Sequence, residues 1–257
     1  MIGFKTRTLM CTLVVFVLVC AQNAQALMIR NVTQNTILFR DGFENNSTPP
    51  DPAVVGGATV GTWSSFNPDA RIGDLANDGI AAVQGSRYLV ADHTGDKFAH
   101  AFMDLDLSSA VNDDVIEMEF SYYQAGGREI LNGPWIYYST DHATDDVGGF
   151  GTVGDGGIHE SGPGYGPTGS SLTLNTWHTL VLSTTVGTTD YALSVDGGAP
   201  IAIAGAGDIA TANSVVFNRW GLEALFYIDA IPEPNSATLL MIAGLGVGLA
   251  GRRKRRS

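Results

Sequence analysis

The chain has 257 residues and a formal net charge of −12, but this charge is concentrated in its central part. Residues 27–231 contain 25 acidic and seven basic side chains, which gives that region a net charge of −18. A surface this acidic repels phosphate backbones, so nucleic-acid binding is excluded as a function. The 44% content of hydrophobic residues excludes a disordered chain, and the 32 glycines indicate many turns rather than a helical bundle.

Residues 1–26 have the three parts of a secretory signal peptide. Lys5 and Arg7 provide the positive start, an uncharged and mostly apolar run follows from Leu9 to Ala21, and Ala24-Gln25-Ala26 matches the A-x-A cleavage pattern. A retained anchor helix is the alternative, but the apolar run is short for a membrane span. We therefore expect export and removal of this segment by signal peptidase.

Both cysteines of the chain, Cys11 and Cys20, lie inside the signal peptide. Cleavage after Ala26 would leave a mature protein without a disulfide, a thiolate metal site or a cysteine nucleophile. A lipoprotein signal would use Cys20, but the bulky Val19 before it does not suit such a site. The mature protein must therefore be stabilised by the packing of its core, with bound metal as a further means.

Residues 27–231 show the alternation of apolar and polar residues that predicts β-strands. In Val115–Tyr122 every second side chain is apolar, while Glu117 and Glu119 lie on the opposite face. Segments 177–183 and 191–196 predict a hairpin with its loop around Gly187. No long helical pattern and no internal repeat occurs, so the short strands and many turns predict an all-β, antiparallel β-sandwich. Further strands are expected at 37–39, 88–91, 99–105, 135–139, 201–203, 215–217 and 225–228.

Several of these segments resemble the concanavalin A-like (laminin-G-like) jelly-roll domains. Residues 37–44 resemble the opening strand of that family, residues 176–180 and 191–197 its central hairpin, and residues 226–231 its closing strand. The resemblance implies a jelly roll of two antiparallel sheets. The same family includes carbohydrate-binding domains, enzymes and structural modules, so the resemblance leaves the function open.

Glu117 and Glu119 are two residues apart in one predicted strand, so they share a face about 7 Å apart. Two carboxylates near this separation can hydrolyse glycosides. Laminarinase-type members of the resembled superfamily have a third acid and a central Asp in such a strand. Here Ser121 takes the place of the third acid and the central Asp is missing. We therefore expect no catalytic residues, and a solvated or sugar-facing sheet surface instead.

The abundant acidic oxygens favour calcium as the metal ion, if any is bound. Glu44 ends the first strand of the resembled fold and Asp229 ends the last. In jelly rolls that this chain resembles, the terminal strands lie side by side and can share a calcium ion. Glu44 and Asp229 are therefore the candidate ligands, and a solvated acidic surface is the alternative. Further acidic candidates are Asp92, Asp96, Asp141, Asp145 and Asp146.

Segment 141–170 predicts a long, flexible loop. Within it Gly149–Gly154 formally matches the nucleotide-binding pattern G-x-G-x-x-G, but no helix is expected to follow, so nucleotide binding is rejected. Tyr165 and His159 of this segment are candidates for contact with a sugar.

The five histidines lack the spacing of metal ligands. Tryptophans that would stack on a sugar if exposed, and otherwise belong to the core, are Trp63, Trp135, Trp177 and Trp220.

Residues 232–257 have three parts in a fixed order. Pro232, Glu233 and Pro234 favour an extended segment that a protease can bind. Asn235–Gly251 is an uncharged stretch of about 25 Å as a helix, short for a transmembrane helix. A permanent membrane anchor is the alternative, but glycines in this stretch weaken the helix. The chain then closes with the cluster Arg252, Arg253, Lys254, Arg255 and Arg256, which the positive-inside rule keeps cytoplasmic.

This order of parts resembles the PEP-CTERM protein-sorting tail. The resemblance implies export, an inner-membrane intermediate, and processing by an exosortase, in proteins commonly associated with exopolysaccharide and biofilm. Similar tails also occur in proteins described as ice-binding. We therefore expect a non-catalytic cell-surface or extracellular β-sandwich that associates with extracellular polysaccharide. A glycan-active hydrolase or lyase is the alternative; an ice-binding protein is a further one, without the regular array of threonines that it would need.

Overall fold

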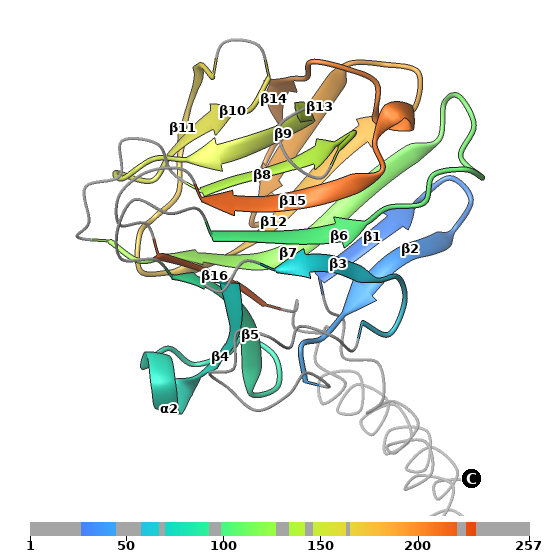
Figure 1. Cartoon of the computed structure of the whole chain (residues 1–257). Helices are drawn as coiled ribbons and strands as arrows, with labels where there is room; N and C mark the ends of the chain where they lie inside the picture. The colour runs from blue at the N-terminus through green and yellow to red at the C-terminus, as the bar shows by residue number, and fades with distance from the viewer. Residues whose placement is uncertain are drawn as a thin grey trace, which may run out of the picture. The chain divides into compact units, whose positions relative to one another are not determined.

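The computed structural model describes residues 27–44, 58–66, 70–92, 99–126, 134–141, 146–162, 165–219 and 225–229. These residues form two antiparallel β-sheets that pack face to face, with one large hydrophobic core between them (Figure 1). The predicted all-β sandwich is therefore confirmed. Residues 25–231 form one compact unit.

The first sheet has nine strands, seven of them in the order β14-β13-β12-β7-β16-β5-β4. Of the other two strands, β1 pairs with the edge of β7 that also pairs with β16, and β2 pairs with β1. The strands are β1 (Leu27–Asn31), β2 (Thr36–Asp41), β4 (Ala70–Asp74), β5 (Arg87–Asp92), β7 (Val115–Gln124), β12 (Trp177–Thr185), β13 (Asp190–Val195), β14 (Ile201–Ala204) and β16 (Leu225–Asp229).

The second sheet has seven strands in the order β11-β10-β9-β8-β15-β6-β3. In Figure 1 it lies in front of the first sheet, with β15 and β6 running across the view. Its strands are β3 (Trp63–Phe66), β6 (Ala99–Asp104), β8 (Pro134–Ser139), β9 (Asp146–Thr152), β10 (Gly157–Glu160), β11 (Pro167–Ser171) and β15 (Ser214–Arg219). The described helical elements are the single turn α2 (Leu75–Asp78) and the 3-10 helix η1 (Ile209–Thr211).

The core is built by the alternation that the sequence showed in β7. Phe120 is fully buried, and its ring lies 6.5 Å from that of Phe150 and 6.2 Å from that of Phe217, both from the second sheet. Burying a phenylalanine side chain contributes about 1.5–3 kcal/mol, so contacts of this kind hold the two sheets together. The inward-facing side chains of β7 are Ile116, Met118, Phe120 and Tyr122.

The predicted loop at 141–170 is wrong, because half of this segment forms β9, β10 and β11 at one end of the second sheet. Its glycines hid the strands from the sequence, since they offer no apolar alternation. In the fold, large aromatic rings occupy the space that side chains would fill. A Cβ on Gly148 would lie 2.4 Å from the Tyr191 ring, and one on Gly151 would lie 2.3 Å from the indole of Trp135. The rejected nucleotide motif lies in β9 and the turn before β10, so a strand follows it and not a helix.

The domain begins one strand earlier than the resemblance implied. Residues 37–44, the predicted opening strand, contain all of β2 except Thr36, and β2 pairs with β1 rather than with the closing strand β16. The strand that shares an edge of β7 with β16 is β1. Its five residues were too few to stand out beside the predicted cleavage site, although Leu27 and Ile29 point into the core.

Candidate functional site

A short segment, Leu75–Ser86, covers part of the outer face of the first sheet; we call it the strap. Beneath it lies a cluster of aromatic side chains that alternate with core residues and therefore face away from the second sheet. The Tyr88 and Tyr227 rings are 5.4 Å apart, and the Tyr123 and Trp177 rings are also 5.4 Å apart. The strap is fixed to these rings, since the Tyr88 hydroxyl donates to the Ile80 carbonyl at 2.8 Å and Trp177 Nε1 donates to the Ala81 carbonyl at 3.0 Å.

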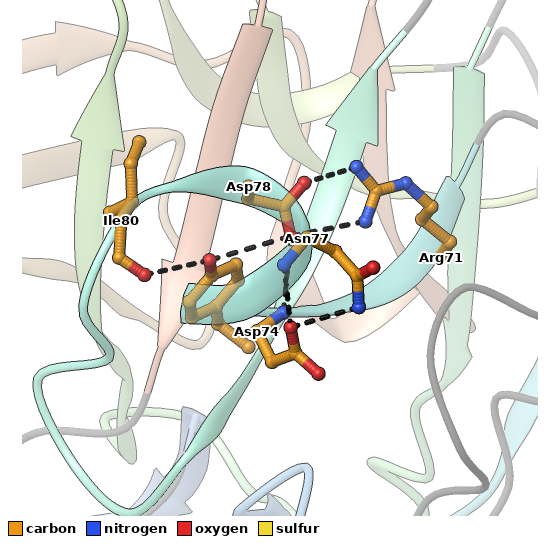
Figure 2. A network of polar contacts seen from close by, with 6 residues as sticks. Arg71, Asp74, Asn77, Asp78 and Ile80 are labelled. Atoms are coloured by element: carbon orange, nitrogen blue, oxygen red, sulfur yellow. Dashed lines mark hydrogen bonds and ion pairs between the residues drawn. The ribbon is translucent and has the colours of Figure 1, made fainter.

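The first turn of the strap is ordered by its own polar contacts (Figure 2). Asp74 caps α2 by accepting the Asn77 N–H at 2.9 Å, and Gly79 ends the turn in the left-handed conformation. Arg71 reaches from β4 to form an ion pair with Asp78, whose side chain is only 3% exposed. This partly buried ion pair joins the turn to β4, and Asp78 also accepts the Asp74 N–H at 3.1 Å.

The two candidate calcium ligands both bind the strap. The Asp229 carboxylate, fully buried at the end of β16, accepts the backbone N–H groups of Val83 and Gln84. The Glu44 carboxylate accepts the N–H groups of Ser86 at 2.7 Å and Arg87 at 2.8 Å. Because N–H groups point at these oxygens, the arrangement favours holding the strap over binding a cation. No group of three acidic, histidine or cysteine side chains suited to a metal ion lies among the described residues. A shared calcium ion stays a prediction.

Glu117 and Glu119 lie on the outer face of the first sheet, beside β1. Arg30 of β1 donates to Glu117 through Nε at 3.1 Å and Nη2 at 2.7 Å, and its Nη2 lies 4.0 Å from Glu119. Burial raises the pKa of Glu119, with Arg30 opposing the shift and Glu117 adding to it. Ser121, in the place of a third acid, is buried opposite Asp229. The sequence argument missed Arg30 because it did not predict β1.

The outer face of the second sheet carries a second aromatic cluster. Trp135 and Tyr137 of β8 and Val216 of β15 are buried there, with Phe102 of β6 packed against them. Tyr165, just before β11, lies at its border with its ring 5.2 Å from that of Trp135 and half of its surface exposed. Of the residues predicted to meet a sugar, Trp135, Tyr165 and His159 thus come together.

Of the tryptophans and histidines whose side chains the structure describes, Trp63 lies in the core, Trp177 beneath the strap and His178 in a hairpin. Trp63 belongs to the core, where its Nε1 donates to Asp41 at 2.6 Å. His178 is buried, with Nδ1 2.7 Å from an Asp196 oxygen and Nε2 3.0 Å from the Thr173 carbonyl. His178 therefore joins the segment before β12 to the residue that follows β13. Trp220, His93, His142, Asp96 and Asp145 lie outside the described residues.

Asp146 at the start of β9 is a carboxyl in an unfavourable environment. Its Oδ1 is buried and makes no hydrogen bond. Burial raises the pKa of Asp146 to about 7, although the Ser161 hydroxyl and the Gly148 N–H oppose the shift. The group therefore changes charge near neutral pH in the folded protein.

The predicted processing residues Ala24, Ala26, Pro232–Pro234 and 252–256 lie outside the described residues. In the part of the chain that the structure describes, no helix has the length and apolar character that crossing a bilayer requires. The sequence profile described as "PEP-CTERM protein-sorting motif" matches residues 230–256. The chain carries a PEP-CTERM sorting tail. The resemblance found in the sequence is thereby confirmed, and the tail marks the protein as one that is exported and sorted by exosortase.

Comparison with solved structures gives only distant similarities, and no curated protein matches the sequence significantly. A sialidase is 11% identical over 63% of this chain, with a TM-score of 0.42, and this chain spans 16% of its length. A GH131 β-glucanase catalytic domain from Podospora anserina is 13% identical, covering 78% of this chain and 97% of its own, with a TM-score of 0.41. An endo-1,3-β-glucanase (laminarinase) catalytic domain from Thermotoga petrophila RKU-1 is 12% identical. The match covers 76% of this chain and 96% of the laminarinase chain, with a TM-score of 0.35. Similarity this distant carries no argument about activity.

The strap contacts predict the effect of Asp229→Ala on residues 27–231. Removing the carboxylate leaves two backbone N–H groups without their acceptor, so the free energy of unfolding should fall by about 2–4 kcal/mol. Thermal melts in chelator and in millimolar calcium measure this, with Asp190→Ala at an exposed carboxylate as the charge-matched control.

A calcium ion shared by Glu44 and Asp229 predicts a different result. Calcium, but not magnesium, would then stabilise the wild type by about 2.7 kcal/mol at a hundredfold excess over Kd, and Asp229→Ala would lose that gain.

Asp146 predicts a stability that falls as the pH rises. Its folded pKa of about 7 lies above its unfolded value of 3.8, so the folded state holds the extra proton between these limits. The stabilisation is complete below about pH 4 and is lost through about pH 7, by up to about 1.4 kcal/mol per pH unit. Denaturant unfolding of wild type and Asp146→Asn across this range isolates the effect. The variant should gain on the wild type from pH 4 to 7 and not above, and a constant difference would contradict this assignment.

Proposed function

We propose that the mature protein is a non-catalytic β-sandwich, displayed at the cell surface or released outside the cell, that associates with extracellular polysaccharide. The observation that carries the proposal is the PEP-CTERM tail at 230–256, directly after the closing strand β16. This tail addresses the protein to export and exosortase processing. The inner-membrane intermediate, the processing at Pro232-Glu233-Pro234 and the association with biofilm belong to the proposal.

A binding role agrees with the way the carboxylates are used. Glu117 is held by Arg30, while Asp229 and Glu44 hold the strap. Asp114, with a pKa lowered by the Val111 N–H and the Asn31 side chain, holds the turn before β7. These acids stabilise a sandwich that has no disulfide. A structural role therefore explains the positions of these carboxylates, and no catalytic role is needed.

A glycan-active enzyme remains the second candidate because of one observation. Burial raises the pKa of Glu119, which lies beside Glu117, and Glu117 forms an ion pair with Arg30. Glycosidases divide the roles of acid and base between two neighbouring carboxyl groups, one of which has a raised pKa. In this hypothesis Glu119 would donate the proton to the leaving oxygen.

One assay on residues 27–231 distinguishes a polysaccharide-binding protein from a glycan-active enzyme. The protein is incubated with extracellular polysaccharide from the source cells; bound protein is measured after sedimentation, and new reducing ends or unsaturated ends are measured in the supernatant. The proposal predicts retention without new ends, equal for wild type and Glu119→Gln. New ends that disappear in Glu119→Gln would establish the enzyme, and absence of both retention and new ends would reject polysaccharide as the partner.

A further inference from the structure

One row of residues crosses the outer face of the second sheet at the end where β8 begins. Trp135 of β8 lies opposite Gly151 of β9, which lies opposite His159 of β10, which in turn lies opposite Pro167 of β11. Ile136 and Ile158, the neighbours of Trp135 and His159 along their strands, point into the core, so these two side chains point outward. The bare backbone at Gly151 gives the indole its place, because a Cβ there would lie 2.3 Å from the ring.

Tyr165 borders this row and is held in a fixed position. Its backbone has a positive φ of 47°, a conformation that costs a residue with a side chain about 1–2 kcal/mol. The Tyr165 N–H donates to the Gly162 carbonyl at 3.2 Å, and His159 Nδ1 lies 3.1 Å from the Tyr165 carbonyl, so the backbone of Tyr165 is held from two sides. The ring is 52% exposed and meets Trp135 edge to face. A fixed, exposed aromatic ring is a platform on which the apolar face of a sugar can stack.

Trp135 provides an unused hydrogen-bond donor next to this platform. The residue is 5% exposed, and its Nε1 has no hydrogen-bond partner. A buried donor without an acceptor costs about 1–3 kcal/mol, and a sugar hydroxyl is an acceptor. The Trp135 and Tyr165 rings are 5.2 Å apart, so a ligand seated against Tyr165 would lie beside the indole. His159 Nδ1 lies beside the Tyr165 carbonyl, and His159 Nε2 adds further hydrogen-bonding capacity.

The charge of the protein decides which sugars fit. Residues 27–231 have a net charge of −18, which repels uronates, sialic acids and sulfated sugars. We propose that Tyr165, Trp135 and His159 form a binding subsite for a neutral sugar unit, with Tyr165 as the stacking platform. This inference rests on the polysaccharide association proposed above and names the part of the surface that performs it.

The test is affinity electrophoresis of residues 27–231 in gels containing soluble neutral polysaccharides (a β-glucan, a galactan, a mannan or a xylan), with polygalacturonate as the anionic comparison. Wild type should be retarded by at least one neutral polymer. Tyr165→Ala should weaken that retardation about ten-fold and Tyr165→Phe should preserve it, because the ring face remains. Trp135→Phe should weaken it by a smaller factor, since it keeps a ring and loses the donor. Val111→Ala, which removes an exposed apolar side chain elsewhere, should have no effect.

The possible failures are distinct. Wild-type binding that Tyr165→Ala leaves unchanged, with Tm and circular dichroism intact, would overturn the subsite and keep the polysaccharide function. Retardation by polygalacturonate alone would overturn the neutral-sugar assignment. No retardation by any polymer, together with no retention on polysaccharide from the source cells, would overturn the proposed function and the subsite with it.

Discussion

The two end strands of the domain share one edge of β7, and the rest of the first sheet depends on this arrangement. β12 pairs with β7 from Val115 to Tyr123, so it occupies the whole opposite edge. The other edge is divided, with Met28 of β1 opposite Glu119 and Asp229 of β16 opposite Ser121. Each end strand also has a second neighbour, β2 or β5. Neither end of the domain is therefore a free sheet edge, which would invite pairing with another chain.

This closure suits the predicted removal of a targeting segment from each end of the domain. The predicted signal peptide ends one residue before β1, and Pro232 lies three residues after β16. Both targeting segments can therefore be removed without the loss of a strand. The carboxylate that ends β16 also binds the strap, so the last residue of the sandwich is fixed from two directions. In a sandwich without disulfides, hydrogen bonds, packing and the ion pair between Arg30 of β1 and Glu117 of β7 hold the end strands in place.

Strands whose own side chains alternate between apolar and polar were predicted from the sequence. The glycine-rich strand β9, whose face is covered by side chains from neighbouring strands, was not. β7, β12 and β13 were predicted because their apolar residues recur at every second position, facing the core. β9 was missed because aromatic rings from β8 and β13 cover its glycines, a tertiary effect that local pattern does not contain. Among candidate site residues, Glu117 and Glu119 were placed on the correct shared face, but their partner Arg30 was not. Glu44 and Asp229 were paired by resemblance; they share the strap through backbone N–H groups that no sequence motif indicates.

Native-state hydrogen exchange of residues 27–231, read amide by amide, tests the closure of the domain on β7 most directly. If β1 and β16 complete the sheet, their paired amides open only in the global unfolding, and their exchange free energies equal those of β7 and β12. The strap amides of Val83 and Gln84, held by one side chain, should open more easily. Exchange of β1 or β16 at the rate of a fraying terminus, while β7 stays protected, would contradict the account.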